Sequence, residues 1–285
     1  MKLEGPDGLD LLQRISTNDM RVLGLGEHVQ SVLTNEKGRV IDVVTVLKTG
    51  TESLLLAGMS DDELTLVKWI EKFIVMENVQ LASLSKNKTQ ILLFNIMDMN
   101  TSPNLSIKNA HILKLKPLNW KRSLLIVDTQ VQEETLAILD ANGFVKSTVE
   151  DYDLYRLEEG IPGFPNEIST QFNPIEIGLQ SLVSFSKGCY VGQEVIARLD
   201  TYDKVRRSLR RMTLSVPPRQ LPADLNNSVG EKAGILTSYG RSKGHDSGIL
   251  GLGLVRFDVG DQALSYVTEE GQREGKASIL SDPKA

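Results

Sequence analysis

Apolar residues recur at helical spacing in the segments that we predict to be helices. In residues 9–15 a leucine or isoleucine returns every third position after the turn-forming GPDG, and Asp7 or a nearby residue is the candidate cap. Residues 61–77 keep one face apolar, and Asp61 and Asp62 favour the first turn of that helix. The same spacing predicts shorter helices over residues 132–142, 152–160 and 192–199.

Other segments in the first half of the chain are runs of Val, Ile and Leu, which are typical of strands. The segments NEKGR and KTGTE between them have the composition of turns. The predicted strands cover residues 31–34, 40–48, 53–57, 90–97 and 123–129.

The pattern changes after Arg211, where no long helical periodicity remains. Short apolar runs separated by Gly, Pro and Asn predict a small all-β barrel or sandwich, with residues 215–232 as a loop-rich entry. Its strands are predicted over residues 212–216, 234–239, 248–257, 264–270 and 275–280. We therefore expect an α+β fold, with a body of helices and mixed or antiparallel sheets over residues 1–207 and a C-terminal β-barrel over residues 208–285.

The composition is that of an ordinary globular protein. A chain of 285 residues can bury a sizeable core, and a formal net charge of −5 gives no general attraction to nucleic acid or an anionic membrane. The single cysteine cannot close an intrachain disulfide, and no signal-peptide-like or membrane-spanning apolar run is present. We expect a cytoplasmic protein, with an organellar matrix as the alternative if a transit peptide has been removed.

Several common kinds of site have no motif in this chain. His28, His111 and His245 are far apart in sequence, and a lone thiol supplies too few thiolates for a resident iron–sulfur cluster, so no metal site is predicted. The glycines of GLGLG and GLGLVRF do not follow the strand–turn–helix order of a dinucleotide-binding motif, and no phosphate-binding loop motif occurs.

Residues 204–211, KVRRSLRR, are the strongest local charge feature. One interpretation is a solvated strand edge that charge protects from aggregation. Another is a site for an anion, such as the carboxylate or phosphate tail of a small molecule. A nucleic-acid site is the least favoured interpretation because no aromatic residues are interleaved with the run.

The only cysteine, Cys189, lies in KGCYVGQE, directly before the predicted helix over residues 192–199. The start of a helix and Lys187 would both favour a thiolate, and in an extended segment the two side chains would point to the same side. Gly188 and Gly192 permit backbone angles or close approaches that other residues forbid. The alternative is a small buried hydrophobic side chain in a turn, and the residues alone favour neither interpretation.

The longer stretch KGCYVGQEVIARLDTYDKVRR resembles the signature of the YgfZ-type folate-binding proteins, relatives of the glycine-cleavage T-protein (aminomethyltransferase). Its core, K-G-C-[FY]-x-G-Q-E, is long and specific. Further segments agree with the family in the same order along nearly the whole chain: LLQRISTNDMRVL, NEKGRVIDV, YRLEEGIP, FNPIEIGL, GILTSYG and LGLGLVR. The resemblance implies a T-protein-like folate-binding body followed by a C-terminal β-barrel.

The resemblance also implies residues that bind the cofactor. Glu176, in the P-x-E stretch, matches the glutamate that holds the pterin ring of tetrahydrofolate, where a carboxylate accepts two parallel N–H bonds from an aminopyrimidine edge. Arg156 and Tyr190 are further folate-binding candidates. For Arg156, a core salt bridge to Glu158 or another carboxylate is an equally good interpretation. Residues 18–19, in the T-N-D motif, have a loop-capping role as their alternative.

The same resemblance makes Cys189, Lys187 and Asp42 the candidate catalytic residues, with Asp42 also lining the folate pocket. T-proteins carry an Asp-Asp pair at this point, and one of the two assists aminomethyl transfer. Here Asp42 is followed by Val43, and the loss of a carboxylate where protonation must be steered counts against transferase chemistry.

These observations leave three functional hypotheses. The first is a factor that uses tetrahydrofolate or a one-carbon derivative and supports iron–sulfur cluster assembly or repair, with client or assembly proteins as partners. The second is a folate-dependent aminomethyltransferase. The third is a non-catalytic interaction module with a vestigial pocket, since fold and family do not fix function.

Overall fold

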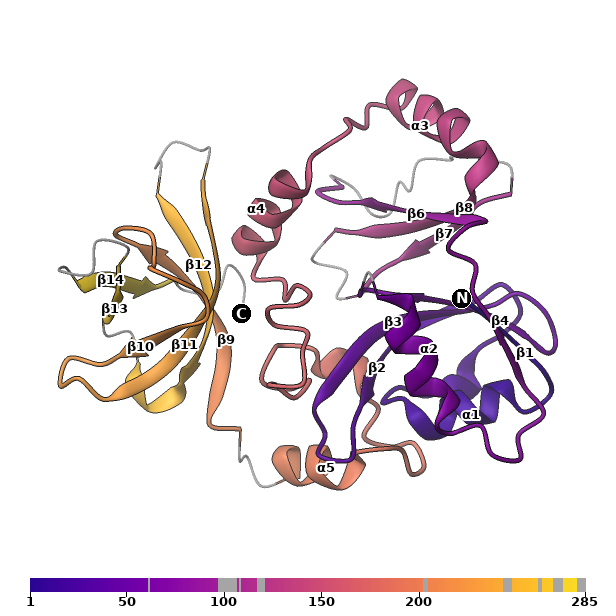
Figure 1. Cartoon of the computed structure of the whole chain (residues 1–285), viewed down its shortest axis with the longest axis horizontal. Coiled ribbons are helices and arrows are strands. Elements are labelled where there is room, and N and C mark those ends of the chain that lie inside the picture. The colour runs from indigo at the N-terminus through magenta and orange to yellow at the C-terminus, as the bar shows by residue number, and fades with distance from the viewer. Residues whose placement is uncertain are drawn as a thin grey trace. The chain divides into compact units, whose positions relative to one another are not determined.

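The computed structural model describes residues 1–60, 62–96, 107, 109–116, 121–201, 205–242, 248–260, 263–268 and 274–280. It divides into two compact units (Figure 1). The first unit comprises Met1–Ser147 and Ser181–Glu194, and the second comprises Thr148–Gln180 and Val195–Ala285. The predicted α+β class with a C-terminal barrel is confirmed. The boundary that we placed after residue 207 stays a prediction.

The first unit contains a five-stranded antiparallel sheet in the order β2-β3-β4-β1-β5. Its strands are β1 (Lys2–Glu4), β2 (His28–Thr34), β3 (Val40–Lys48), β4 (Ser53–Gly58) and β5 (Gln80–Ala82). The three long strands are those that the apolar runs predicted. The other two have three residues each, too few to produce a recognisable alternation.

Two helices, α1 (Gly8–Ile15) and α2 (Glu63–Glu71), bury their apolar faces in the same core as this sheet. Asp62, which we expected to favour the first turn of α2, is its N-cap, and its side chain accepts a hydrogen bond from Thr65 N at 3.0 Å. Asp7 occupies the N-cap position of α1, as expected, but its side chain makes no cap bond and accepts instead from Asn78 N at 2.7 Å. Asp61 lies outside the described residues.

A three-stranded antiparallel sheet completes the first unit, in the order β6 (Lys88–Leu93), β8 (Ser123–Asp128), β7 (His111–Lys114). One face packs against α3 (Gln132–Ala141), which contributes Leu139 to their shared core. The other face packs against the five-stranded sheet, since Ile126 shares a cluster with Leu47 and Leu55. The unit is therefore built of two stacked sheets with a helix on the outer face of the smaller one.

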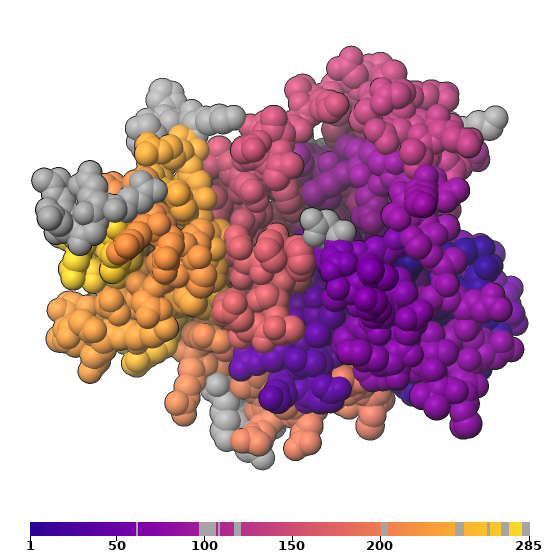
Figure 2. Space-filling view, in the orientation of Figure 1, coloured from indigo at the N-terminus to yellow at the C-terminus, as the bar shows by residue number. Residues whose placement is uncertain are grey.

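The second unit joins α4 (Val149–Glu159) to a closed six-stranded barrel. A capping box between Thr148 and Asp151 starts α4, and Gly160 ends it in the left-handed conformation at φ 73°. The barrel strands run in the order β10-β11-β12-β9-β14-β13, and the space-filling view colours them orange to yellow (Figure 2). They are β9 (Arg207–Leu214), β10 (Ala223–Asn226), β11 (Lys232–Arg241), β12 (Ile249–Arg256), β13 (Leu264–Val267) and β14 (Glu274–Ile279).

The segment that we predicted to be only a loop-rich entry contains a strand, β10. Its alternation is short, but Ala223 pairs with Leu236 of β11 and Leu225 is fully buried in the barrel core. Tertiary pairing therefore overrides a local composition rich in Pro and Asn.

The remaining helices are short. The helix α5 (Gln193–Thr201) follows the cysteine motif, as predicted, and crosses the division between the two units. The 3₁₀ turns are Met20–Val22, Thr129–Val131, Gln180–Leu182 and Phe257–Val259. No helix within the described residues is long and apolar enough to cross a membrane.

Candidate functional site

The lysine of the cysteine motif is buried and fully bonded. Lys187 is 8% exposed, and its Nζ donates to the carbonyl oxygens of Gln13, Ser16 and Asn18 at 2.7, 2.8 and 2.6 Å. Burial lowers the pKa of this ammonium to about 8, with the Asp19 carboxylate opposing the shift. The side chain therefore points into the unit and still carries a proton at neutral pH.

Cys189, in contrast, is exposed. The interpretation of the thiol as a small buried side chain is wrong, and so is the shared direction of Cys189 and Lys187. A Cβ added at Gly188 would meet no atom within 4 Å, so that glycine is not required by contact. Gly192 is required, because its φ is +81° and an added Cβ would lie 2.5 Å from the Asn35 carbonyl oxygen.

Tyr190 turns inward from the same segment. It is 7% exposed, and the Lys187 Nζ lies 5.3 Å from the centre of its ring, within the range of a cation–π contact. Burial raises the pKa of its hydroxyl to about 12. Its side chain thus packs beside the buried ammonium, and its role as a folate-binding residue stays a prediction.

Asp42 is a buried carboxylate with one satisfied and one unsatisfied oxygen. The side chain is 1% exposed, and Oδ1 accepts hydrogen bonds from the backbone N–H groups of Val43, Met59 and Ser60 at 2.7, 3.1 and 3.2 Å. Oδ2 is buried without a hydrogen-bond partner. Burial outweighs the three backbone donors and raises the pKa of this carboxyl to about 6. Val43, where T-proteins have a second aspartate, is a core residue.

The unsatisfied oxygen lies next to Gly58, which lines a cavity of about 260 Å³ in the first unit. A Cβ added at Gly58 would lie 2.7 Å from Oδ2 and 3.0 Å from a methyl carbon of Leu66. Any larger residue at position 58 would therefore collide with the buried carboxylate.

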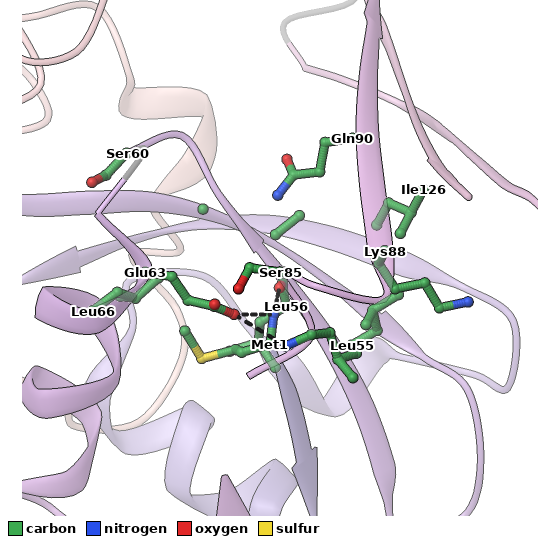
Figure 3. A pocket seen from close by; sticks show the side chains of 13 residues that line it. Met1, Leu55, Leu56, Ser60, Glu63, Leu66, Ser85, Lys88, Gln90 and Ile126 are labelled. Carbon is green, nitrogen blue, oxygen red and sulfur yellow. Dashed lines mark hydrogen bonds and ion pairs between the residues drawn. The ribbon is translucent and has the colours of Figure 1, made fainter. Parts of the chain in front are cut away.

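The cavity is lined by both apolar and polar side chains. Figure 3 shows the residues around it: Leu55 and Leu56 of β4, Glu63 and Leu66 of α2, Gln90 of β6 and Ile126 of β8. Glu63 is engaged, because it accepts from the Ser83 hydroxyl at 2.5 Å and lies 3.1 Å from the amino group of Met1. The side chain of Lys88 is ion-paired with Asp128 at 2.7 Å.

Glu176 belongs to the second unit, where Arg207 binds its carboxylate. Arg207 Nε donates to Oε1 at 2.8 Å and Nη2 donates to Oε2 at 3.3 Å, and the guanidinium lies 5.3 Å from the ring centre of Phe172. The local turn is fixed by Asn173, whose side-chain oxygen accepts from the backbone N–H groups of Ile175 and Glu176, both at 3.0 Å. The carboxylate is 12% exposed.

Part of the basic run is not a free strand edge. Residues 207–211 pair with β12 on one side, and on the other side Leu209 N donates to the Glu176 carbonyl oxygen at 2.8 Å. Sequence reasoning did not single out Arg207 from its neighbours. The signal that could have done so is the family match of Glu176, because a partly buried carboxylate needs a partner. Lys204 lies outside the described residues.

Arg156 is buried and forms the salt bridge that we gave as its alternative role, with other carboxylates than Glu158. Its Nε donates to Asp153 at 2.6 Å and its Nη1 to Glu167 at 3.1 Å, while its Nη2 donates to the Ser238 hydroxyl at 3.0 Å. Glu167 is fully buried and also accepts from Gly163 N at 2.9 Å. Nothing in the sequence indicated that Glu167 is the buried partner of Arg156, because Glu167 simply follows a Pro/Gly-rich loop.

The T-N-D residues tie a loop, which agrees with their capping alternative. Asn18 Nδ2 donates to the Gln30 carbonyl oxygen at 2.8 Å, and Asp19 accepts from Arg21 N at 3.0 Å. Within the described residues, no group of three or more His, Cys, Asp and Glu side chains is placed to hold a metal ion.

The candidate residues are thus divided between the units. Asp42, Lys187, Cys189 and Tyr190 belong to the first, and Glu176, Arg156 and the missed Arg207 belong to the second. In the first unit a buried carboxylate with one unpartnered oxygen lies next to Gly58, a residue that lines the cavity. In the second unit, the carboxylate of Glu176 is held in one orientation by its two hydrogen bonds from Arg207.

Residues 1–94 match the family of the GCVT N-terminal domain. The tRNA-modifying protein YgfZ of Vibrio vulnificus is 32% identical over 145 residues, which are 48% of this chain and 43% of that protein. A chloroplastic protein of Arabidopsis thaliana, whose name carries a provisional transferase assignment, is 39% identical over 116 residues, 41% of this chain and 26% of that protein. The chain thus matches less than half the length of these two relatives.

Lower similarity extends along the whole chain. An aminomethyltransferase of Listeria monocytogenes is 26% identical over 309 aligned positions, covering 99% of this chain and 82% of that protein. The structure of the glycine cleavage system aminomethyltransferase T from Bartonella henselae superposes with a TM-score of 0.78 at 18% identity, covering 99% of this chain and 82% of the other.

The chain therefore has the fold of the aminomethyltransferases. The match of the N-terminal domain, the YgfZ relatives and the motif around Cys189 support a YgfZ-type protein related to the glycine-cleavage T-protein.

Proposed function

We propose that this chain is a tetrahydrofolate-binding factor of the YgfZ type that supports the assembly or repair of iron–sulfur clusters in other proteins. One observation carries the folate part of the proposal. Asp42 holds a buried oxygen with no partner next to Gly58, which lines the cavity, in a chain with the fold of an aminomethyltransferase. A buried acceptor without a partner costs stability, so its retention is understandable where a ligand supplies the donor.

The residues present fit parts of a folate. The cavity volume of about 260 Å³ is smaller than that of a typical pocket for a whole drug-sized ligand, so it suits one ring system with an apolar face rather than the entire molecule. In the second unit, Glu176 offers a carboxylate for the N–H groups of an aminopyrimidine edge. Arg207 orients that carboxylate through two hydrogen bonds, and Asn173 N donates to its Oε2 at 3.2 Å.

Cys189 is the residue that we propose for contact with clients. A thiol exposed on an anchored segment is accessible to another protein, as a nucleophile or as a transient ligand of sulfur or iron. We place this role in the cytoplasm or in an organellar matrix. The words "tRNA-modifying" belong to the Vibrio relative. We include no nucleic acid among the partners proposed here, since the net charge of −5 gives no general attraction to RNA.

The client role is tested in a bacterial strain that lacks its own YgfZ-type protein, with iron–sulfur enzyme activities as the readout. Cys189→Ser is expected to lose complementation while the wild type restores it. The matched control moves the thiol within the segment by combining Cys189→Ser with Ser186→Cys, since Ser186 is also exposed. Full complementation by Cys189→Ser would contradict the proposed role of the thiol in contact with client proteins.

A folate-dependent aminomethyltransferase is the second candidate, because Asp42 alone retains a carboxyl whose pKa is raised to about 6, near the range useful for proton transfer. The discriminating assay is formation of methylenetetrahydrofolate from an aminomethylated lipoyl carrier protein. Product that disappears in Asp42→Asn would support the transferase. No product above background from the wild type would remove it.

A further inference from the structure

Three carbonyl oxygens at the end of α1 form a cation-binding cluster that the chain fills with its own side chain. The oxygens of Gln13, Ser16 and Asn18 lie 2.6–2.8 Å from Lys187 Nζ. An ammonium group has three N–H donors and no acceptor, so these oxygens satisfy it completely. The negative end of the α1 dipole lies at the same end of the helix and favours a cation there.

We propose that Lys187 is a positioning residue, whose ammonium fastens the segment carrying Cys189 to the C-terminal end of α1 instead of acting on the thiol. All three of its donors are used by carbonyls, and none remains for a neighbouring sulfur. The inference goes beyond the proposed function and does not require it. Order in this segment is measured without folate, client or activity, so the two proposals fail separately.

A second anchor holds the other end of the same segment. Val191 N donates to the Arg14 carbonyl oxygen at 3.1 Å, and Thr34 Oγ1 donates to the Val191 carbonyl oxygen at 2.7 Å. Gly192 packs directly against the turn between β2 and β3. Between the two anchors, Gly188 has open space around its Cα and Cys189 is exposed. The thiol is therefore presented by a short bridge whose two ends are fixed.

The charge of Lys187, rather than its alkyl stem, is what this anchor uses. Tyr190 packs over the ammonium and excludes solvent from it, with its ring centre 5.3 Å from Nζ. A buried ammonium persists only where hydrogen bonds replace its hydration. A methionine of similar length fills the same space, but it leaves the three carbonyls without their donor. Lys187→Met therefore separates packing from charge.

The test is amide hydrogen exchange, followed by mass spectrometry, in peptides that cover residues 182–193. Lys187→Ala and Lys187→Met are expected to raise exchange at Val191 about tenfold or more, because a hydrogen bond to a charged group is lost from one anchor. Added n-propylammonium, which replaces the atoms missing in the alanine variant, is expected to restore protection in Lys187→Ala. Neutral n-propanol is expected to restore none. Lys68→Ala, an exposed lysine on α2, is the matched control and should leave exchange unchanged.

Two results would overturn the proposal. One is unchanged exchange in both variants, and the other is rescue by n-propanol equal to that by n-propylammonium. If the variants do not fold, the wild type decides the question by nitrogen-15 spectroscopy of its lysine side chains. A slowly exchanging ammonium signal with couplings to the carbonyl carbons of Gln13, Ser16 and Asn18 supports the proposal. The absence of such a signal contradicts it.

Discussion

Arg207 binds the carboxylate of Glu176 through two hydrogen bonds, of 2.8 Å from Nε and 3.3 Å from Nη2. The residue with the strongest family match to a folate anchor is therefore not an isolated surface charge. It is one half of an ion pair whose other half lies over an aromatic ring and begins a barrel strand. A ligand bound by Glu176 would meet a carboxylate whose direction is already fixed.

Arg207→Lys should lower the stability of the folded protein although it keeps the charge. A lysine cannot form both hydrogen bonds to Glu176, and it has no flat group to lie over the ring of Phe172. We expect a loss of about 1–2 kcal/mol in the free energy of unfolding, moderated by the partial exposure of Arg207. Urea unfolding of Arg207→Lys, Glu176→Gln and the double variant gives the coupling energy. Additive effects of the two single changes would show that the pair contributes nothing beyond its separate groups.

Arg156 should be far less tolerant of substitution. Arg156→Met leaves Glu167 as a fully buried carboxylate without its cation, and we expect a loss of about 3–5 kcal/mol in the free energy of unfolding. Arg256→Met is the matched control, since Arg256 forms an exposed pair with Asp258. Chemical unfolding checks both. Equal small losses in the two variants would contradict a structural role for the Arg156 network.

The two glycines of the cysteine motif should respond differently to alanine. Gly192→Ala places a Cβ against the Asn35 carbonyl oxygen in a left-handed backbone, so we expect a cost of about 2 kcal/mol or more. Gly188→Ala meets open space and should change the stability by less than about 0.5 kcal/mol. Thermal unfolding of the pair decides the point, and a Gly192→Ala variant as stable as Gly188→Ala would refute the close approach.

The buried Asp42 predicts a specific pH dependence. Its pKa in the folded chain is about 6, above the ordinary value of 3.8, so the folded state holds a proton that the unfolded chain has released. The resulting stabilisation is complete below pH 3.8 and is lost as the pH rises through 6. Between pH 5 and 7, Asp42→Asn should therefore gain about 1 kcal/mol relative to the wild type.

Urea unfolding at a series of pH values measures this difference. Asp258→Asn is the control, because the Arg256 hydrogen bond lowers the pKa of Asp258 and places its titration below this window. A difference between Asp42→Asn and the wild type that stays constant from pH 5 to 7 would show that Asp42 is not the desolvated carboxyl described here.

Much of the fold could be predicted from local patterns. The long strands β2, β3 and β4 and the helices α1, α2 and α3 carry enough apolar residues for their periodicity to be read. The strands β1, β5 and β10 could not be read in this way, because three or four residues carry almost no periodicity and their partners are distant in sequence.

The site was less predictable than the fold. The sequence motif identified Lys187 and Cys189 as neighbours, but not that one is buried and the other exposed. That difference depends on carbonyl oxygens from residues 13–18, which are far away in sequence. A salt bridge of Arg156 was one of two equal interpretations, but its partner Glu167 lies eleven residues away and can be identified only in the folded chain. For Glu176 the reverse holds. Nothing in the local sequence distinguishes it from an ordinary surface carboxylate, and only the resemblance to the family identified it as a candidate.

The central claim, that this chain binds tetrahydrofolate, is tested most directly by anaerobic calorimetric titration of tetrahydrofolate into the wild type and Glu176→Ala. Glu274→Gln, an exposed carboxylate on β14, is the control. We predict saturable binding to the wild type and the control, and an affinity at least about tenfold lower in Glu176→Ala, from the loss of a charge-assisted pair of hydrogen bonds. No binding to the wild type would contradict the account and leave an interaction module with a vestigial pocket. Equal affinity in all three proteins would remove Glu176 as the anchor.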